Sequence, residues 1–260
     1  MSRSKIAIIT TVANFELYKK TSQLFPNNIR KYVIDGTNGM HGIYSIFYLF
    51  KKLKNEDIKW LIMADEDVIL KNNFELFSLI NKMEKEEIAC CGVRDGGMIS
   101  HRNFNPFVIN TFFSIINFQK IKSIFSKNEI IRNQFIAKNE FDDDLTRLNY
   151  DFHINSLYEP YYCFYLWLRR KGFKMLFLNT KMHDDGISNY VLTPNGSELL
   201  IHTWYARSYG ENIKHTKRIN KFLKLEAKNE NFNQPIYFKD QLFSTKRLLR
   251  KNLKRIKKRF

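Results

Sequence analysis

Runs of consecutive apolar residues alternate with helical apolar stripes over the first part of the chain. The runs that predict buried strands are 5–12, 31–36, 59–65 and 88–93. The stretches with apolar positions at helical spacing are 13–25, 41–54 and 74–87. Strands without polar alternation are typical of a parallel sheet that helices cover on both faces. We therefore predict an α/β fold, in which ligands bind beyond the carboxyl ends of the strands.

The second half of the chain has a looser pattern. Its expected elements are an apolar helix over 105–125, an acidic loop over 141–152, a helix over 159–172, a strand over 174–179, a loop over 183–191 and a strand over 197–207 that runs into a turn. The helix over 159–172 has the clearest ends. Glu159 and Pro160 suit a first helical turn, and Gly172 suits the position after the last turn.

Composition places the protein among globular proteins of a reducing compartment. Of its 260 residues, 44% are hydrophobic and 15% aromatic, which is enough apolar surface for a full core. The three cysteines form neither a disulfide ladder nor a zinc pattern, and the adjacent Cys90 and Cys91 lie in an apolar run as core residues would. The N-terminus lacks the apolar run of a signal peptide, and no stretch is long enough to span a bilayer. We expect a cytoplasmic protein.

Positive charge is concentrated at the C-terminus. The net charge is +17, and residues 245–260 carry nine Lys or Arg and no acid. Within this tail Leu249, Leu253, Ile256 and Phe260 recur at spacings that place them on one face of a helix. A basic amphipathic helix over 241–260 would bind an anionic membrane surface peripherally. A solvated basic terminus is the alternative explanation.

Three consecutive acids follow the third predicted strand. Asp65, Glu66 and Asp67 end the apolar run KWLIMAD, where buried negative charge is costly unless a cation meets it. Two carboxylates at positions i and i+2 can hold one divalent ion, directly or through water. Hard oxygen ligands select Mg²⁺ or Mn²⁺, which in turn bind phosphate oxygens.

With this triplet at the end of a central strand, the sequence resembles the GT-A fold, nucleotide-sugar-dependent glycosyltransferases and their DXD motif. The resemblance implies that Asp65 and Asp67 hold Mn²⁺ or Mg²⁺ on the donor diphosphate, with Glu66 in the nucleotide site. It implies a nucleotide-binding half over 1–97 and an acceptor half over 98–240. The expected reaction is transfer of a sugar, of the hexosyltransferase type, to a glycan or lipid-linked acceptor in surface polysaccharide or lipopolysaccharide synthesis.

The resemblance also suggests residues in the second half. Glu159 is similar to the acid that serves as general base in inverting members, although Pro160 stands where many of them carry a second acid. Glu159 could instead simply favour a helix N-terminus. His202 resembles a late histidine that ligates the metal, and a core histidine is the alternative. His183 and Asp184 are weaker candidates for contact with the acceptor or the diphosphate.

The ends of the first two strands are the expected nucleoside pocket. Thr10, Thr11 and Val12 end the first strand, and Asp35 ends the second. A carboxylate there can accept hydrogen bonds from a base N–H or a ribose hydroxyl. Asp35 and Gly36 could instead form an ordinary turn, which this dipeptide favours.

Two other functions compete with glycosyl transfer. ADEDVIL nearly matches the motif of haloacid-dehalogenase-like phosphatases, in which Asp65 would be the nucleophile and Asp67 the general acid. That motif normally ends the first strand, whereas here two strand–helix units precede it. The basic composition is also compatible with a nucleic-acid-binding module. The aromatic residues lie mostly in apolar runs, however, and we expect no nucleic-acid partner.

Overall fold

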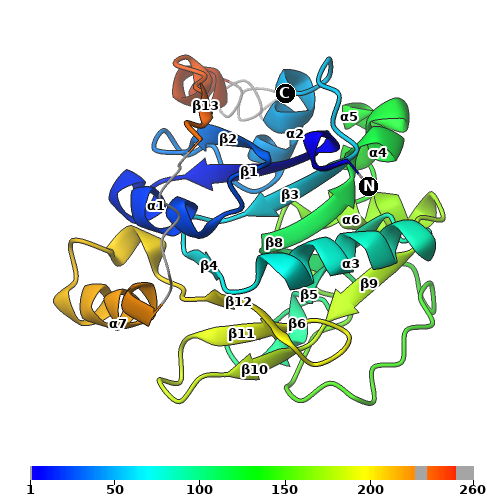
Figure 1. Cartoon of the computed structure of the whole chain (residues 1–260). Helices are drawn as coiled ribbons and strands as arrows, with labels where there is room; N and C mark the ends of the chain where they lie inside the picture. The colour runs from blue at the N-terminus through cyan, green and yellow to red at the C-terminus, as the bar shows by residue number, and fades with distance from the viewer. Residues whose placement is uncertain (1, 226–232, 250–260) are drawn as a thin grey trace.

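The computed structural model describes residues 2–225 and 233–249. Its centre is a seven-stranded sheet in the order β13-β2-β1-β3-β8-β5-β9 (Figure 1). The strands are β1 Ile6–Val12, β2 Arg30–Asp35, β3 Trp60–Ala64, β5 Cys90–Arg94, β8 Ile109–Asn117, β9 Met175–Leu178 and β13 Ile236–Phe238. Only β8 runs antiparallel to its neighbours in this sheet. The expected α/β fold with a mostly parallel sheet is confirmed.

Helices cover both faces of the sheet. They are α1 Phe15–Thr21, α2 Ile43–Lys52, α3 Asn73–Lys85, α4 Phe118–Ile124, α5 Lys127–Ile131, α6 Tyr162–Arg170 and α7 Ile213–Leu225. One core cluster joins α2, α4 and α6 to the sheet, and a second joins α3 to the opposite face. Successive residues of β1 alternate between the two clusters, since a strand directs successive side chains to opposite faces. Cys90 and Cys91 are fully buried, as predicted.

Local sequence signals account for several helix ends. Asn14 and Asn72 accept hydrogen bonds from the backbone N–H groups of Leu17 and Glu75, at 3.0 and 3.1 Å, and so begin α1 and α3. Gly172 has a φ of 75°, and the N–H of Phe173 donates to the carbonyl of Leu168 at 3.1 Å. This is the hydrogen bond of a Schellman end after α6, the role predicted for Gly172.

The prediction of a helix over 105–125 is wrong in its first part. Residues 109–117 form β8, which lies between β3 and β5, and only residues 118–124 form a helix, α4. A continuous apolar run fits a buried strand as well as a buried helix, so periodicity does not separate them. The predicted helix over 159–172 is present, but α6 itself begins at Tyr162, and Glu159 lies in the turn before it.

A smaller antiparallel sheet lies beside the central one. Its order is β10-β11-β12-β4, with β10 Thr180–Met182, β11 Asn189–Leu192, β12 Glu198–His202 and β4 Val68–Leu70. The predicted loop over 183–191 therefore includes the start of a strand. A third pair, β6 Gly96–Ile99 with β7 Arg102–Asn103, projects from the end of β5. Short 3₁₀ turns complete the elements: η1 Arg3–Lys5, η2 Ser22–Leu24 and η3 Ala206–Ser208.

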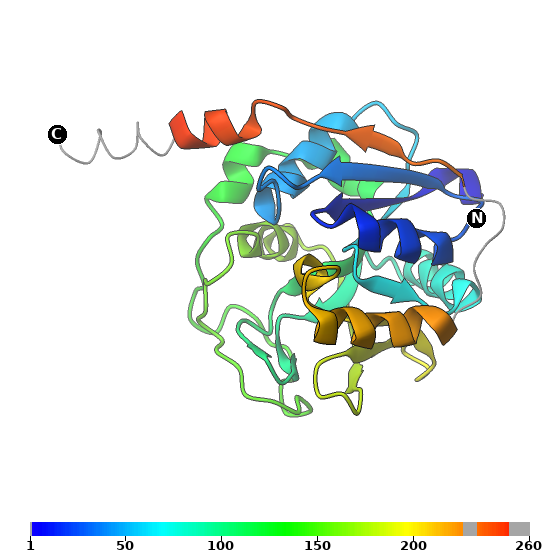
Figure 2. The ribbon, with the colours of Figure 1, turned by 90° about the vertical axis from the view of Figure 1, so that its left-hand side faces the viewer.

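Near the end of the described chain, β13 and Phe243 pack against the body of the protein. β13 pairs in parallel with β2, and residues 243–249 are helical (Figure 2). Phe243 is only 9% exposed and meets Tyr44 of α2 edge to face, whereas Leu242 is 60% exposed. The rest of the predicted amphipathic helix, including Leu253, Ile256 and Phe260, lies outside the described residues. Among the helices that are described, none has the length and apolarity needed to cross a bilayer.

Candidate active site

A cavity of about 580 Å³ lies at the edge of the central sheet where β1, β2 and β3 end. Parallel strands bring their carboxyl ends to the same edge, and the register pairs Val12 with Asp35 there. The predicted site residues that line the cavity are Thr11, Asp65, Glu66, Asp67, Glu159 and His202. Residues from both halves of the sequence therefore face one space.

The pairing of β4 with β12 brings Asp67 and His202 together. β4 begins directly after Asp67, and its first residue, Val68, is opposite His202 in the antiparallel register. His202 Nε2 lies 3.3 Å from Asp67 Oδ1, and both side chains are almost fully buried. The backbone carbonyl of Asp67 accepts hydrogen bonds from the N–H and the hydroxyl of Thr203, both at 3.0 Å. These two hydrogen bonds fix the backbone of Asp67 and thereby the place from which its side chain extends.

His202 is held between two aromatic rings. Its imidazole stacks on Phe112 at 4.0 Å between ring centroids and contacts Trp204 at 4.1 Å. Its Nδ1 atom is buried and has no hydrogen-bond partner among the described residues. A buried polar atom without a partner is uncommon, and this one lies beside the acidic triplet.

The surroundings of Asp65 disfavour the charged form of its carboxyl. Burial raises the pKa of its carboxyl well above the ordinary value, and the charges of Glu66 and Asp67 raise it further. Arg207, an exposed residue of η3, is the cation that opposes this rise. Carboxylates that raise one another's pKa in a cavity form a site where a divalent cation would be strongly attracted.

The donor set of the cavity fits Mn²⁺ or Mg²⁺. Two carboxylates and one imidazole are ligands that these ions accept, and a diphosphate would supply further oxygens. Among the residues that the structure describes, no three His, Cys, Asp or Glu side chains are already gathered into a complete metal cage. Asp67 and His202 are in contact, and Asp65 lines the same cavity.

Glu66 forms hydrogen bonds to the loop that follows β1. Its Oε1 accepts hydrogen bonds from the backbone N–H groups of Ala13 and Asn14, at 2.9 and 3.1 Å. Its side chain is 5% exposed, and burial together with the charge of Asp67 raises its pKa. Glu66 therefore fixes the loop that leaves β1, next to the expected nucleoside pocket.

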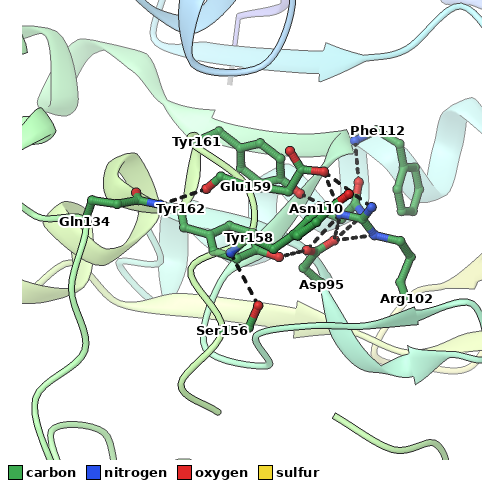
Figure 3. A network of polar contacts seen from close by, with 10 residues as sticks. All are labelled: Asp95, Arg102, Asn110, Phe112, Gln134, Ser156, Tyr158, Glu159, Tyr161 and Tyr162. Carbon is green, nitrogen blue, oxygen red and sulfur yellow. Dashed lines mark hydrogen bonds and ion pairs between the residues drawn. The ribbon is translucent and has the colours of Figure 1, made fainter. Parts of the chain in front are cut away.

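Glu159, which also lines the cavity, belongs to a network of polar contacts (Figure 3). Arg102 of β7 forms a bidentate ion pair with Asp95, with contacts of 2.8 to 3.0 Å, and lies 3.4 Å from Glu159 Oε1. Burial would lower the pKa of Arg102, but the charge of Asp95 raises it above the ordinary value. Arg102 therefore stays charged and ties Glu159 to the sheet.

Asp95 anchors this network from a fully buried position. Besides Arg102 it accepts hydrogen bonds from Asn110 and from the hydroxyl of Tyr162, the first residue of α6. The carbonyl of Glu159 accepts a hydrogen bond from Gln134 at 3.0 Å. Glu159 is thus positioned through both its backbone and its side chain, which keeps 28% of its surface exposed.

Several predicted site residues lie elsewhere. Thr10 and Val12 are fully buried behind the cavity wall, where they can support a ligand but not contact it. Asp35 pairs with Lys239 at 2.7 Å and accepts hydrogen bonds from Thr37, so it forms a turn and an ion pair. Burial alone would raise the pKa of Asp35, but these contacts lower it below its usual value.

His183 and Asp184 are not brought to the cavity. Both belong to the turn between β10 and β11, and neither lines the cavity. His183 accepts a hydrogen bond from the backbone N–H of Asp185 and packs its ring against Phe222 of α7. Asp184 is exposed to solvent at this turn.

Sequence reasoning missed the segment after β12. Trp204 and Tyr205 both have positive φ values, 57° and 63°, a conformation that costs about 1–2 kcal/mol for each such residue. They place Tyr205, Arg207 and Ser208 on the cavity wall, with Tyr205 stacked on His215. The only sequence signal for a role of this segment in the site was that HTWYARS comes at the end of a predicted strand. Strained backbone beside a cavity is a frequent feature of ligand sites.

No protein-family model matches the sequence, and no curated protein matches it significantly. The solved structures that resemble it include a mannosyltransferase from Pyrobaculum calidifontis in complex with GDP-Man and Mn²⁺, at 8% identity and TM-score 0.30 over 48% of this chain. They also include a glycosyltransferase involved in the glycosylation of the major capsid of PBCV-1, at 18% identity and TM-score 0.34 over 46% of this chain. These matches span 47% and 63% of those chains. Mouse xyloside xylosyltransferase 1 matches 68% of this chain and 85% of its own, at 10% identity and TM-score 0.38.

Proposed function

We propose that this protein is a metal-dependent glycosyltransferase, which moves a sugar from a nucleotide-sugar donor to a glycan or lipid-linked acceptor. The observation that carries the proposal is the acidic triplet at the end of β3, which shares one cavity with His202 and with Glu159. Such a cavity combines a set of cation-binding side chains with a partly exposed carboxylate, Glu159. A donor diphosphate and an acceptor hydroxyl are the groups that these two features would receive.

In this proposal Asp65, Asp67 and His202 hold Mn²⁺ or Mg²⁺ at the donor diphosphate. When bound, the ion neutralises negative charge that develops on the departing nucleotide. Arg207, which also lines the cavity, contributes further positive charge near Asp65. Glu66 holds the loop after β1, so that Thr11 and Ala13 form the wall beside the nucleoside.

Glu159 is the proposed general base. Its partly exposed carboxylate can accept the proton of an acceptor hydroxyl, while Arg102 fixes the side chain in direction. The half of the chain over 1–97 would then bind the donor, and the half over 98–240 the acceptor. Acceptors of this kind occur in surface polysaccharide or lipopolysaccharide synthesis, at the cytoplasmic face of a membrane to which the basic tail over 241–260 would attach the enzyme.

The place of Asp65 in the fold disfavours the phosphatase alternative. There Asp65 would attack phosphorus as a carboxylate, and the motif that supplies such a nucleophile normally ends the first strand of the sheet. The strand that Asp65 follows is the third along the chain and not the first. Hydrolysis of a simple phosphomonoester, without any sugar nucleotide, is the reaction that would support a phosphatase.

A thermal-shift screen tests the proposal. The full chain is mixed with UDP-, GDP-, CMP- and dTDP-sugars, each with and without Mn²⁺. A ligand at one hundred times its dissociation constant stabilises the native state by about 2.7 kcal/mol, so one donor should raise the melting temperature only with Mn²⁺ present. If no sugar nucleotide shifts the melting temperature under either condition, the proposal is wrong.

A further inference from the structure

A second and larger hollow lies on the face of the sheet covered by α2. Its volume is about 1270 Å³, and it lies between α2, the α4–α5 connection, the turn before α6 and the helical segment over 243–249. Its apolar lining includes Tyr44, Phe47, Phe125, Ile131, Leu157 and Phe243. We call this hollow the aromatic groove. No residue of the acidic triplet belongs to it.

The aromatic groove has a firm floor and an exposed upper wall. Phe125 stacks on Phe50 at 4.1 Å between ring centroids and meets Phe47 edge to face at 6.1 Å. Higher on the wall, Ile131 is 51% exposed and Leu157 38% exposed. Pockets for drug-sized ligands measure about 300–1,000 Å³, so the groove has room for a larger apolar ligand.

Cations surround this apolar surface. The basic residues among the lining are Lys51, Lys54, Lys122, Lys127, Lys246 and Arg247, against one acid, Asp240. Lys246 pairs with Asp240 at 3.2 Å, which leaves the rim with a large positive excess. An apolar floor with a cationic rim is complementary to a ligand that has a long hydrocarbon chain and an anionic head.

The aromatic groove adjoins the active-site cavity at one end. Met40 lines both hollows, and Pro160, which lines the groove, directly follows Glu159, which lines the cavity. Arg247 reaches the same junction. Its Nη1 atom is so close to Gly39 that a Cβ on that residue would lie 3.1 Å from it.

His41 connects this junction to the active-site cavity electrostatically. It lines the cavity, and burial lowers its pKa, with the charges of Arg207 and Arg247 lowering it further. The charges of Arg247 and Glu159 both act on His41, so Arg247 is a rim cation close to the junction with the active-site cavity. A ligand lying along the groove would have its anionic head at Arg247.

We propose that the aromatic groove binds the hydrocarbon chain of a phosphate-bearing lipid acceptor, with the phosphate at Arg247. This assignment rests on the proposed glycosyl transfer, because it extends the acceptor from the cavity into the groove. The chain lies between α2 and α5, and the group beyond the phosphate enters the cavity toward Glu159. The acceptor would thus be recognised mainly by its lipid part and its phosphate, on a surface distinct from the donor site.

The test measures binding of a minimal probe to the full chain by isothermal titration calorimetry. Decyl phosphate, kept below its micelle concentration, supplies both parts of the ligand, while methyl phosphate supplies only the head and decyl maltoside only the chain. We expect decyl phosphate to bind at least tenfold more tightly than either control. Donor binding with Mn²⁺ is measured in parallel, so that failure of the groove is distinguished from failure of the proposed transferase function.

Two variants and their matched controls locate the binding. Ile131→Glu places a charge on the exposed groove wall, and Arg247→Glu reverses the charge at the junction. Their controls are Phe74→Glu and Lys85→Glu on α3, both exposed on the other face of the sheet. We expect each groove variant to weaken decyl phosphate binding at least tenfold, and each control to leave it unchanged.

Two outcomes would overturn the assignment. One is equal affinity for decyl phosphate in the groove variants and their controls. The other is binding that appears only after the chain is shortened to end at Leu249, because the residues beyond Leu249 would then be the occupant of the groove. Both outcomes can be measured even if no sugar donor is found, because decyl phosphate contains neither a nucleotide nor a sugar.

Discussion

His202 Nε2 lies 3.3 Å from Asp67 Oδ1, although the two residues are far apart in the sequence. The contact exists because β4 follows Asp67 directly and pairs with β12, of which His202 is the last residue. Two strands of the small sheet thus assemble an oxygen donor and a nitrogen donor at the edge of the large one.

Asp67→Asn should abolish Mn²⁺-dependent stabilisation by the sugar nucleotide. The amide keeps the size of the side chain but removes the charge that attracts the ion, so the fold should remain intact. The measurement is the melting temperature with donor, with and without Mn²⁺. Asp184→Asn is the matched control, since Asp184 is exposed at the β10–β11 turn. Wild-type shifts in Asp67→Asn would show that the metal assignment is wrong.

Glu159→Gln should stop sugar transfer and leave donor binding unchanged. General bases contribute about 10²–10⁴-fold to rate, and a glutamine cannot accept the proton of the acceptor hydroxyl. The readouts are turnover with the donor identified by the screen and the donor-induced shift in melting temperature. Near-normal turnover would reduce Glu159 to a positioning residue of the turn before α6 and favour a retaining mechanism or another base.

Arg102→Met should destabilise the fold through Asp95. The substitution leaves the fully buried carboxylate of Asp95 without its counter-charge, and breaking a buried ion pair costs about 3–5 kcal/mol. The free energy of unfolding in urea measures this. Asp95→Asn in the same chain should restore part of the loss. Arg147→Met, at a residue whose side chain is 91% exposed, should change stability by less than about 0.5 kcal/mol.

Stability should fall in acid because of Asp143. Burial would raise the pKa of its carboxyl, but Arg169 and Arg94, the latter at 2.9 Å, hold it below the ordinary value. A folded pKa below the unfolded value of about 3.9 gives stability that is present above that pH and lost as pH falls toward the folded pKa. Urea unfolding between about pH 5 and 3 should therefore show a steeper decline in wild type than in Asp143→Asn. Asp142→Asn, at an exposed neighbour, should follow wild type.

The tail should bind vesicles that carry anionic lipid. Each cation near such a surface contributes about 1 kcal/mol, so the nine cations of residues 245–260 could hold the protein there reversibly. Co-sedimentation of the full chain should rise with anionic-lipid content, and a chain ending at Asp240 should not sediment. Equal sedimentation of both chains, or binding that ignores lipid charge, would contradict membrane attachment through residues 241–260.

The parallel part of the sheet could be predicted because its strands are buried on both faces. Such strands are uninterrupted apolar runs, and the helices between them show clear stripes. The same property explains why β8 was predicted as part of a helix. Its run INTFFSIIN has no polar alternation to distinguish a buried strand from a buried helix. The sequence pattern did not predict α7, because its buried stripe is short and lies among many lysines. The stripe consists of Ile219, Phe222 and Leu223.

The acids and His202 could be predicted from their places at strand ends, and Glu159 from the start of the predicted helix over 159–172. The acidic triplet has a fixed place at the carboxyl end of β3, so its location follows from the fold class. Arg102 and Asp95 have no such local signal, because their roles depend on contacts with Glu159 and Tyr162 across the fold. Long-range partners of this kind are set by tertiary packing, which a single sequence does not display.

The strand β13 determines how far the chain can be shortened. β13 covers the outer edge of β2, and the residue after it, Lys239, pairs with Asp35. A protein cut at residue 225 would expose the N–H and C=O groups of β2 to any other extended chain, and unpaired edges of that kind promote self-association. Such a truncation would aggregate through β2 even with its acidic triplet intact. Residues 233–240 therefore protect the edge of β2 from pairing with another protein chain.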